Sequence, residues 1–141
     1  MQENIKKPVK YAVILIGIAL ILILANEAYQ YLYYKLPPKL VSVSLRYTPE
    51  EPCRPDTPMH MTIVNDGYRE IIKTSFVLSV KVDEQSNSIA QLLSSNYSTD
   101  RVVAAGETYE GCWAYPKLYN NKHAPENLLY EAKSQSIEFS D

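Results

Sequence analysis

The sequence predicts one transmembrane α-helix followed by an all-β domain, an immunoglobulin-like β-sandwich with one disulfide bond. An uncharged apolar run lies near the N-terminus, alternating apolar and polar residues fill the remainder, and both cysteines fall in that remainder. We expect residues 1–10 to form a cytoplasmic N-terminus and residues 11–36 a transmembrane helix with an extension into the outer membrane interface. Residues 37–39 would be a Pro-Pro linker, and residues 40–141 the extracytoplasmic domain.

The predicted helix rests on the apolar run from Tyr11 to Ala25, which contains no charge. Its fifteen residues would extend roughly 22 Å as a helix, less than the ~30 Å hydrocarbon core of a bilayer. A spanning helix must therefore include flanking residues. No proline interrupts the chain from Val9 to Leu36, and Pro37-Pro38 would end the helix.

Charged residues before the apolar run predict its orientation. Lys6, Lys7 and Lys10 precede the run, and the positive-inside bias favours a cytoplasmic N-terminus. We therefore expect a single-pass protein of the bacterial inner membrane with a periplasmic C-terminal domain. A cleaved signal peptide is the alternative, but residues 24–28 offer no clear small-x-small cleavage site, which favours a retained anchor.

The outer end of the helix is unusually polar and aromatic. Four tyrosines lie between Tyr29 and Tyr34, where they could form an interfacial aromatic belt or a partner-contact surface. Glu27 could reach water, or a second transmembrane helix could shield it, because a lone carboxylate in lipid is unfavourable. We take Glu27, Tyr29 and Tyr33 as candidate contacts with other membrane subunits.

Period-two alternation predicts a β domain of roughly 100 residues, enough for one small domain. Turn-forming residues separate the alternating runs, and Asn65-Asp66-Gly67 is the strongest turn signal among them. Short strands at this spacing are typical of a β-sandwich. Seven strands are expected, over residues 40–47, 59–63, 75–82, 88–93, 101–104, 108–115 and 128–139.

The two cysteines, Cys53 and Cys112, both lie in the predicted outer domain. In an oxidising compartment we expect them to form a disulfide bond. A zinc site with His60 and His123 is the alternative, but the spacing matches no metal signature, and we expect both histidines to be solvated. Cys53 would attach a proline-rich loop, residues 49–58, to the strand or loop that carries Cys112.

Aromatic residues follow the second cysteine and form a second group of candidate contacts. Alternation places Cys112 and Trp113 on opposite faces of a strand. Trp113 could shield the edge of the core, or it could form a binding patch with Tyr115 and Tyr119, because Trp and Tyr are enriched at binding hot spots. The proline-rich loop could likewise stiffen the domain or serve as a rigid recognition surface.

The charge distribution and the absence of catalytic motifs argue against several classes of function. The segment through Lys35 has a net charge of +2 and the remainder −4, which argues against a nucleic-acid partner. No nucleophile elbow, HExxH pair, Walker loop or dinucleotide fingerprint occurs. We therefore expect a protein that is not an enzyme, with no cofactor, no metal and no catalytic residue.

One further pattern involves Cys53, Pro58, Ile63-x-Asn65, Phe76-x-Leu78 and Cys112-Trp113-x-x-Pro116. In these features the chain resembles small bacterial envelope proteins that have a single anchor and an immunoglobulin-like or fibronectin-III-like outer domain. The resemblance covers most of the outer domain and implies no catalytic residue and no particular ligand.

These features together predict an accessory or interaction subunit of an inner-membrane or envelope complex, whose partners are the lipid bilayer and other membrane subunits. A pilus-like or secretion-filament component is one alternative, although the pilin pattern Gly-[Phe/Met]-x-x-x-x-Glu is missing. A small-ligand binder that uses a cleft in the sandwich is the other.

Overall fold

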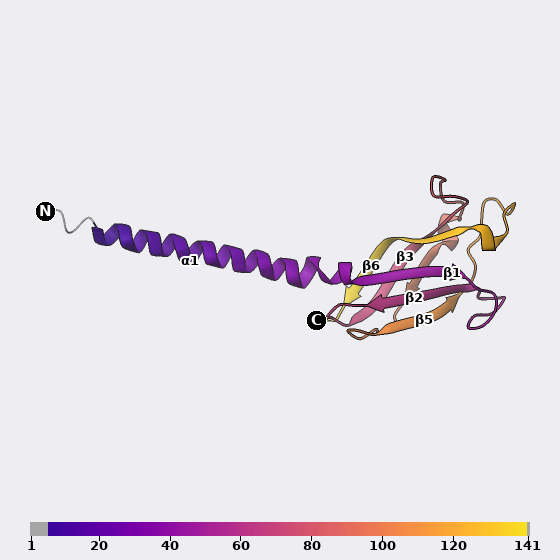
Figure 1. Cartoon of the computed structure of the whole chain (residues 1–141), viewed down its shortest axis with the longest axis horizontal. Coiled ribbons are helices and arrows are strands. Elements are labelled where there is room, and N and C mark those ends of the chain that lie inside the picture. Colours follow the sequence, from indigo (N-terminus) through magenta and orange to yellow (C-terminus); the bar gives the residue numbers. More distant parts are fainter. Residues whose placement is uncertain (1–5, 141) are drawn as a thin grey trace. The chain divides into compact units, whose positions relative to one another are not determined.

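The computed structural model describes residues 6–140, with side chains described from Val9 onward. The chain separates into two compact units, and the division falls between Pro37 and Pro38. The first unit is helical and the second contains all of the strands (Figure 1).

The helical unit consists of α1 (Lys6–Gln30) and a π-helical turn, η1 (Tyr31–Lys35). The helix predicted over residues 11–36 thus changes from α to π geometry in its last turn, where the Leu36 amide donates to the Tyr31 carbonyl at 2.9 Å. The rings of Tyr29 and Tyr33 stack across this transition, with centroids 5.5 Å apart.

The apolar character of this helix extends around its whole circumference, unlike that of an amphipathic surface helix. The segment Val9–Lys35, 27 residues, is long and apolar enough to cross a membrane. At ~1.5 Å per residue it extends about 40 Å, so the flanking residues supply the length that the central run lacks.

The β unit contains two antiparallel three-stranded sheets. One sheet has the order β1-β2-β5 and the other the order β4-β3-β6. The strands are β1 (Val41–Tyr47), β2 (Met59–Asn65), β3 (Ile71–Lys81), β4 (Asn96–Thr99), β5 (Thr108–Trp113) and β6 (Leu129–Phe139). Three short 3₁₀ helices, η2 (Pro37–Leu40), η3 (Leu92–Ser94) and η4 (Pro125–Asn127), lie between them or before β1.

The facing sides of the two sheets enclose one hydrophobic core (Figure 1). On β2, alternate side chains from Met59 to Ile63 are at most 1% exposed, and on β3 Leu78 and Val80 are equally buried. Phe76 of β3 stacks on Tyr97 of β4 with ring centroids 5.6 Å apart. The period-two pattern therefore identified the inward-facing residues of the two central strands correctly.

The structure has six strands among its described residues, and two of the seven expected strands are wrong. Residues 88–93 make a single bridge, from Ala90 to Leu118, before turning into η3. Here the Ser88 hydroxyl accepts a hydrogen bond from the Val80 amide at 3.1 Å, so a side chain takes the place of a backbone carbonyl from a neighbouring strand.

Residues 101–104 likewise make only one bridge, through Val103 to Ile71. Val103 is 1% exposed, so the apolar pattern of residues 101–104 comes from one residue that packs into the core. Conversely, the four-residue strand β4 was not expected, because its sequence Asn96-Tyr97-Ser98-Thr99 is polar and begins within the turn-forming residues Ser94-Ser95-Asn96.

The predicted disulfide is present between Cys53 and Cys112, with Cα atoms 5.6 Å apart. The expectation about strand faces is confirmed as well: Trp113 pairs with Met59 on the core side, and Cys112 pairs with His60 on the outer face. Cys53 is 4% exposed, so the disulfide attaches the proline-rich loop to the outer face of the β1-β2-β5 sheet.

Gly111 allows Trp113 to lie across β5 on the core side. A Cβ atom at Gly111 would lie 2.5 Å from both Cη2 and Cζ3 of Trp113. We therefore expect Gly111→Ala to lower the free energy of unfolding by about 1–3 kcal/mol, because the ring must shift from its packed position. Urea denaturation followed by far-UV circular dichroism measures this change. In a Trp113→Leu background the same substitution should be nearly neutral, and an equal loss in both backgrounds would contradict the explanation.

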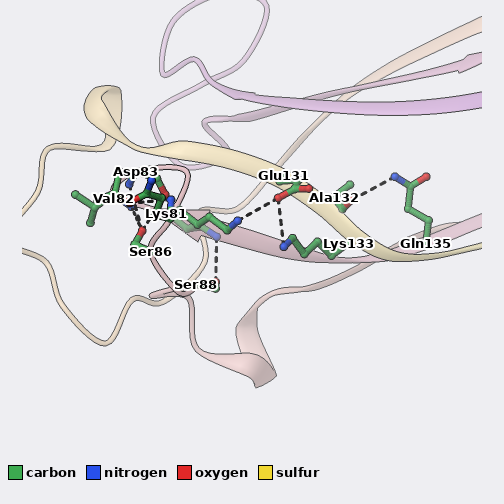
Figure 2. A network of polar contacts seen from close by, with 11 residues as sticks. Lys81, Val82, Asp83, Ser86, Ser88, Glu131, Ala132, Lys133 and Gln135 are labelled. Atoms are coloured by element: carbon green, nitrogen blue, oxygen red, sulfur yellow. Dashed lines mark hydrogen bonds and ion pairs between the residues drawn. The ribbon is translucent and has the colours of Figure 1, made fainter.

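Ion pairs cover the outer face of the β4-β3-β6 sheet. Glu131 of β6 lies 3.6 Å from Lys81 of β3 and 3.4 Å from Lys133 (Figure 2). β6 is an edge strand, and Ser134, with φ 49°, forms a bulge in it. Bulges and charged side chains disfavour pairing with another chain at a sheet edge, so this edge is an unfavourable place for strand addition.

Candidate interaction site

The loops opposite the start of β1 form one end of the β unit, which we call the distal end. It consists of residues 48–58, 82–95 and 114–128, because β1 and β5 end there and β2 and β6 begin there. Most of the irregular structure and two of the three 3₁₀ helices lie in these loops. Loops held by a rigid scaffold are common locations for binding residues.

Two of these loops are held together by backbone hydrogen bonds. The Gln91 amide donates to the Lys117 carbonyl at 2.7 Å, and the Tyr119 amide donates to the Ile89 carbonyl at 2.9 Å. The Ser94 hydroxyl also accepts the Lys117 amide at 2.9 Å. The pairing gives both loops a defined backbone although neither is a strand.

Three large apolar side chains point outward from these paired loops. Leu92 is 64% exposed, Leu93 95% and Tyr119 75%. We call these three residues the distal ridge. Single exposed apolar residues are common, but several on one pair of connected loops are typical of an interaction surface.

A cavity of about 490 Å³ lies beside the distal ridge. Its lining combines apolar surface with amide, ammonium and imidazole groups. The lining residues are Gln91, Tyr115, Pro116, Lys117, Leu118, Asn121, His123 and Pro125. The cavity could therefore accept a partner side chain with both apolar and polar atoms.

A tyrosine network fixes the loop that borders this cavity. The Tyr130 hydroxyl donates to the Pro125 carbonyl at 2.8 Å and lies 3.0 Å from the Tyr115 hydroxyl. The Tyr97 hydroxyl donates to the Ala114 carbonyl at 2.7 Å. Buried tyrosines generally require such partners, and here the partners are in the long loop between β5 and β6.

The environment of these tyrosines keeps their hydroxyls protonated. Burial, with a smaller effect of the nearby Tyr115, raises the pKa of Tyr97 to about 12. Burial also raises the pKa of Tyr130, and its hydrogen bond with Tyr115 raises it further. For Tyr115, burial raises the pKa and the hydrogen bond with Tyr130 partly opposes the rise. None of the three is therefore activated as a base or nucleophile near neutral pH.

The raised tyrosine pKa values predict a loss of stability at alkaline pH. The unfolded chain ionises these hydroxyls near pH 10, whereas folded Tyr97 has a pKa of about 12. This contribution is intact below pH 10 and is lost as the pH rises from about 10 to 12. Tyr97 alone should lower the free energy of unfolding by up to about 1.4 kcal/mol per pH unit in that range. Urea denaturation at pH 9, 10 and 11 measures the slope, which should be shallower for Tyr97→Phe; an unchanged slope would contradict the assignment.

The predicted contact residues fall in different environments. Trp113 packs partly buried against the core and meets Tyr109 edge-to-face, with ring centroids 6.3 Å apart. Tyr115 borders the cavity, and Tyr119 belongs to the exposed distal ridge. The structure therefore does not bring all three into one patch.

The other candidates lie in the helical unit, where Glu27 and Tyr29 belong to α1 and Tyr33 to η1. Leu92 and Leu93 were not predicted as contact residues. The adjacent leucines were interpreted as the end of a strand, and only the 3₁₀ turn directs both outward.

The structure also places the candidate metal ligands and the two histidines. Among the described residues, no group of three or more His, Cys, Asp or Glu side chains could hold a metal ion. His123 is exposed, as expected, but His60 is only 3% exposed, so the expectation of a solvated side chain is wrong there. His60 lies on the central strand β2 beside Cys112, on the face to which the disulfide attaches the proline-rich loop.

Comparison of the chain with protein-family models, curated proteins and solved structures gives no match.

Proposed function

We propose that this protein is a membrane-anchored, non-enzymatic interaction subunit of an envelope complex in a bacterial inner membrane. The helix anchors the chain with its N-terminus in the cytoplasm, and the β unit contacts partners in the periplasm. The exposed apolar segment and the lysines before it support this arrangement. The single observation that carries the interaction role is the distal ridge, three exposed apolar side chains on hydrogen-bonded loops.

We also propose an immunoglobulin-like fold for the β unit. The order β1-β2-β5 corresponds to strands A, B and E of that fold. The neighbours β3 and β6 then correspond to C and F, with β4 on the outer side of C. An experimental structure of the chain with this strand order would support the assignment, and a different pairing would contradict it.

Photo-crosslinking in native membranes tests the distal ridge. We replace Leu93 with a photoreactive phenylalanine analogue in the full-length chain and place the same residue at Lys133 as a control. Lys133 is an exposed position on the outer face of the other sheet. A discrete crosslinked product from position 93 that is absent from position 133 supports the proposal. Equal products, or none at position 93, would contradict it.

A second variant tests whether the ridge contributes binding energy. Leu92→Ser with Leu93→Ser removes apolar surface that is already in solvent, so we expect the fold to be retained. Burying the two leucines in an interface would be worth about 1.5–3 kcal/mol each. Loss of the crosslinked complex at unchanged expression is the expected result, and an undiminished complex would argue against this surface.

The contribution of the helix is tested separately through Glu27. If a second transmembrane helix shields this carboxylate, Glu27→Leu should reduce recovery of the complex in a mild detergent while membrane association remains. Glu27→Gln, which keeps a polar side chain, should retain more of the complex. Unchanged recovery with both variants would remove support for docking through Glu27.

A further inference from the structure

The end of the β unit where β1 begins is opposite the distal end, and we call it the proximal end. It consists of residues 38–40, 66–72 and 100–107. The Asp66 amide donates to the Leu40 carbonyl at 2.9 Å, which joins the second segment to the residue before β1. Ile71 and Val103 form an antiparallel bridge through backbone hydrogen bonds of 3.0 and 2.9 Å. The three segments are therefore held together with a defined backbone.

Three apolar or aromatic side chains are exposed at the proximal end. Tyr68 is 53% exposed, Ile72 39% and Val102 57%. Ile72 and Val102 are the sequence neighbours of the two bridged residues, so period-two alternation directs both side chains away from the core. We call Tyr68, Ile72 and Val102 the proximal patch.

The proximal end has no excess of positive charge. Its segments contain three cationic residues, Lys39, Arg69 and Arg101, and four anionic residues, Asp66, Glu70, Asp100 and Glu107. Two of the cations also make contacts inside the β unit. The Arg69 guanidinium donates to the Ser140 carbonyl at 2.6 Å, and that of Arg101 lies 5.9 Å from the centre of the Tyr109 ring. Attraction of a polybasic surface to anionic lipid is therefore not the basis of a membrane contact here.

In the proposed anchored state, the covalent connection keeps the proximal end close to the bilayer surface. The segment Val9–Lys35 extends about 40 Å as a helix, similar to the ~40–45 Å thickness of a bilayer with its headgroups. β1 begins at Val41, six positions after Lys35, which even a fully extended chain spans in about 20 Å. So short a tether gives the proximal end a high effective concentration at the headgroups, and a few apolar side chains then suffice for a contact.

We propose that the proximal patch docks onto the headgroup layer of the membrane in which the chain is anchored. Tyr68 lies in the headgroup layer, where an aromatic ring with a polar hydroxyl is favoured. The side chains of Ile72 and Val102 leave water beside it. The contact rests on the proposed anchor and adds an orientation to it: the proximal end lies against lipid, and the distal ridge is left free for a partner protein.

Nuclear Overhauser effects (NOEs) between protein methyl groups and lipid protons test the proposal without any substitution. The full-length, methyl-labelled chain is placed in nanodiscs of phosphatidylcholine. We expect NOEs from the methyl groups of Ile72 and Val102 to the choline and glycerol protons of the headgroups. Leu93, 95% exposed on the distal ridge, is the internal control and should give none. Headgroup NOEs that are missing at Ile72 and Val102, or equally strong at Leu93, would overturn the proposal.

The methyl groups of α1 separate a failure of docking from a failure of the anchor. Leu20 and Leu22 should give NOEs to the lipid acyl chains if the helix spans the bilayer. Acyl-chain NOEs without headgroup NOEs at the proximal patch would refute docking and leave the anchor in place. The absence of both would refute the anchor and the docking together.

Lipid composition tests the kind of contact. Nanodiscs that also contain phosphatidylglycerol should give the same headgroup NOEs at the proximal patch, because the contact is apolar and the proximal end has no excess of positive charge. NOEs that appear only with this anionic lipid would contradict the proposal.

A charged variant tests whether the proximal patch holds the contact. Val102→Asp places a carboxylate at an exposed position, so we expect the fold to be retained and the headgroup NOEs of Ile72 to be lost. Leu93→Asp on the distal ridge is the matched control and should leave those NOEs unchanged. If Ile72 kept its headgroup NOEs in Val102→Asp, the apolar patch would not be what holds this end at the membrane, and the proposal would fail.

Discussion

Replacing both cysteines with alanine should lower the free energy of unfolding by about 4 kcal/mol, the value that the chain-entropy model gives for a loop of this length. The bond joins residues 59 positions apart, so its loss frees a long segment of the unfolded chain. The folded state also loses a fixed contact, because Cys53 is 4% exposed and holds the proline-rich loop against the outer face. This loss would be large against the 5–15 kcal/mol that is typical of whole domains.

Urea denaturation of the full-length chain in detergent micelles measures this loss. Trp113 is the only tryptophan in the sequence and is adjacent to Cys112, so its fluorescence reports on the β unit. The wild-type chain, oxidised and reduced, provides the matched comparison without any substitution. A difference below about 1 kcal/mol in both experiments would show that the proline-rich loop is held by other contacts.

The sequence was sufficient to predict the elements whose pattern reflects burial along several residues. The apolar helix and strands such as β1, β2 and β3 were identified because the hydrophobic pattern of each one extends over many consecutive residues. Residues 101–104 were misassigned because one buried residue, Val103, is flanked by residues in a loop. A short run of apolar residues does not distinguish a strand from a loop in which one residue contacts the core.

The candidate site was harder to predict because it depends on tertiary placement. Tyr119 was identified from its residue type, but the exposure of Leu92 and Leu93 depends on a 3₁₀ turn held by a neighbouring loop. His60 is buried on the outer face of β2, where it pairs with Cys112, the residue to which the disulfide joins the proline-rich loop. Both arrangements depend on contacts between segments that are distant in the sequence, and such contacts leave no local sequence pattern.

Asn65 shows that a turn signal can indicate more than a turn. Its side chain is fully buried, and the two hydrogens of Nδ2 are shared among three carbonyls, those of Arg69, Val103 and Ala104, which lie 2.8, 3.0 and 3.1 Å from the nitrogen. Its Oδ1 accepts the Gly67 amide at 3.1 Å. One amide group therefore connects the end of β2 with two loops, including one that lies almost forty residues later in the sequence.

We expect Asn65→Ala to lower the free energy of unfolding by about 3 kcal/mol, because it leaves carbonyl groups without their donor inside the protein. Asn65→Asp should be at least as destabilising at neutral pH, although it is nearly isosteric. A carboxylate has no hydrogens to donate and would face three carbonyl oxygens. The alanine variant thus measures the loss of the contacts, and the aspartate variant isolates the donor function of the amide.

The matched control is Asn120→Ala, because Asn120 also bonds its own loop but is exposed, with Oδ1 3.0 Å from the Lys122 amide. Water replaces that contact, so the expected change is within about 0.5 kcal/mol. Denaturation of all three variants, followed through Trp113 fluorescence, gives the comparison. If Asn65→Asp were as stable as the wild type, the amide hydrogens would not be what holds the two loops to β2. The buried asparagine would then act only through its shape.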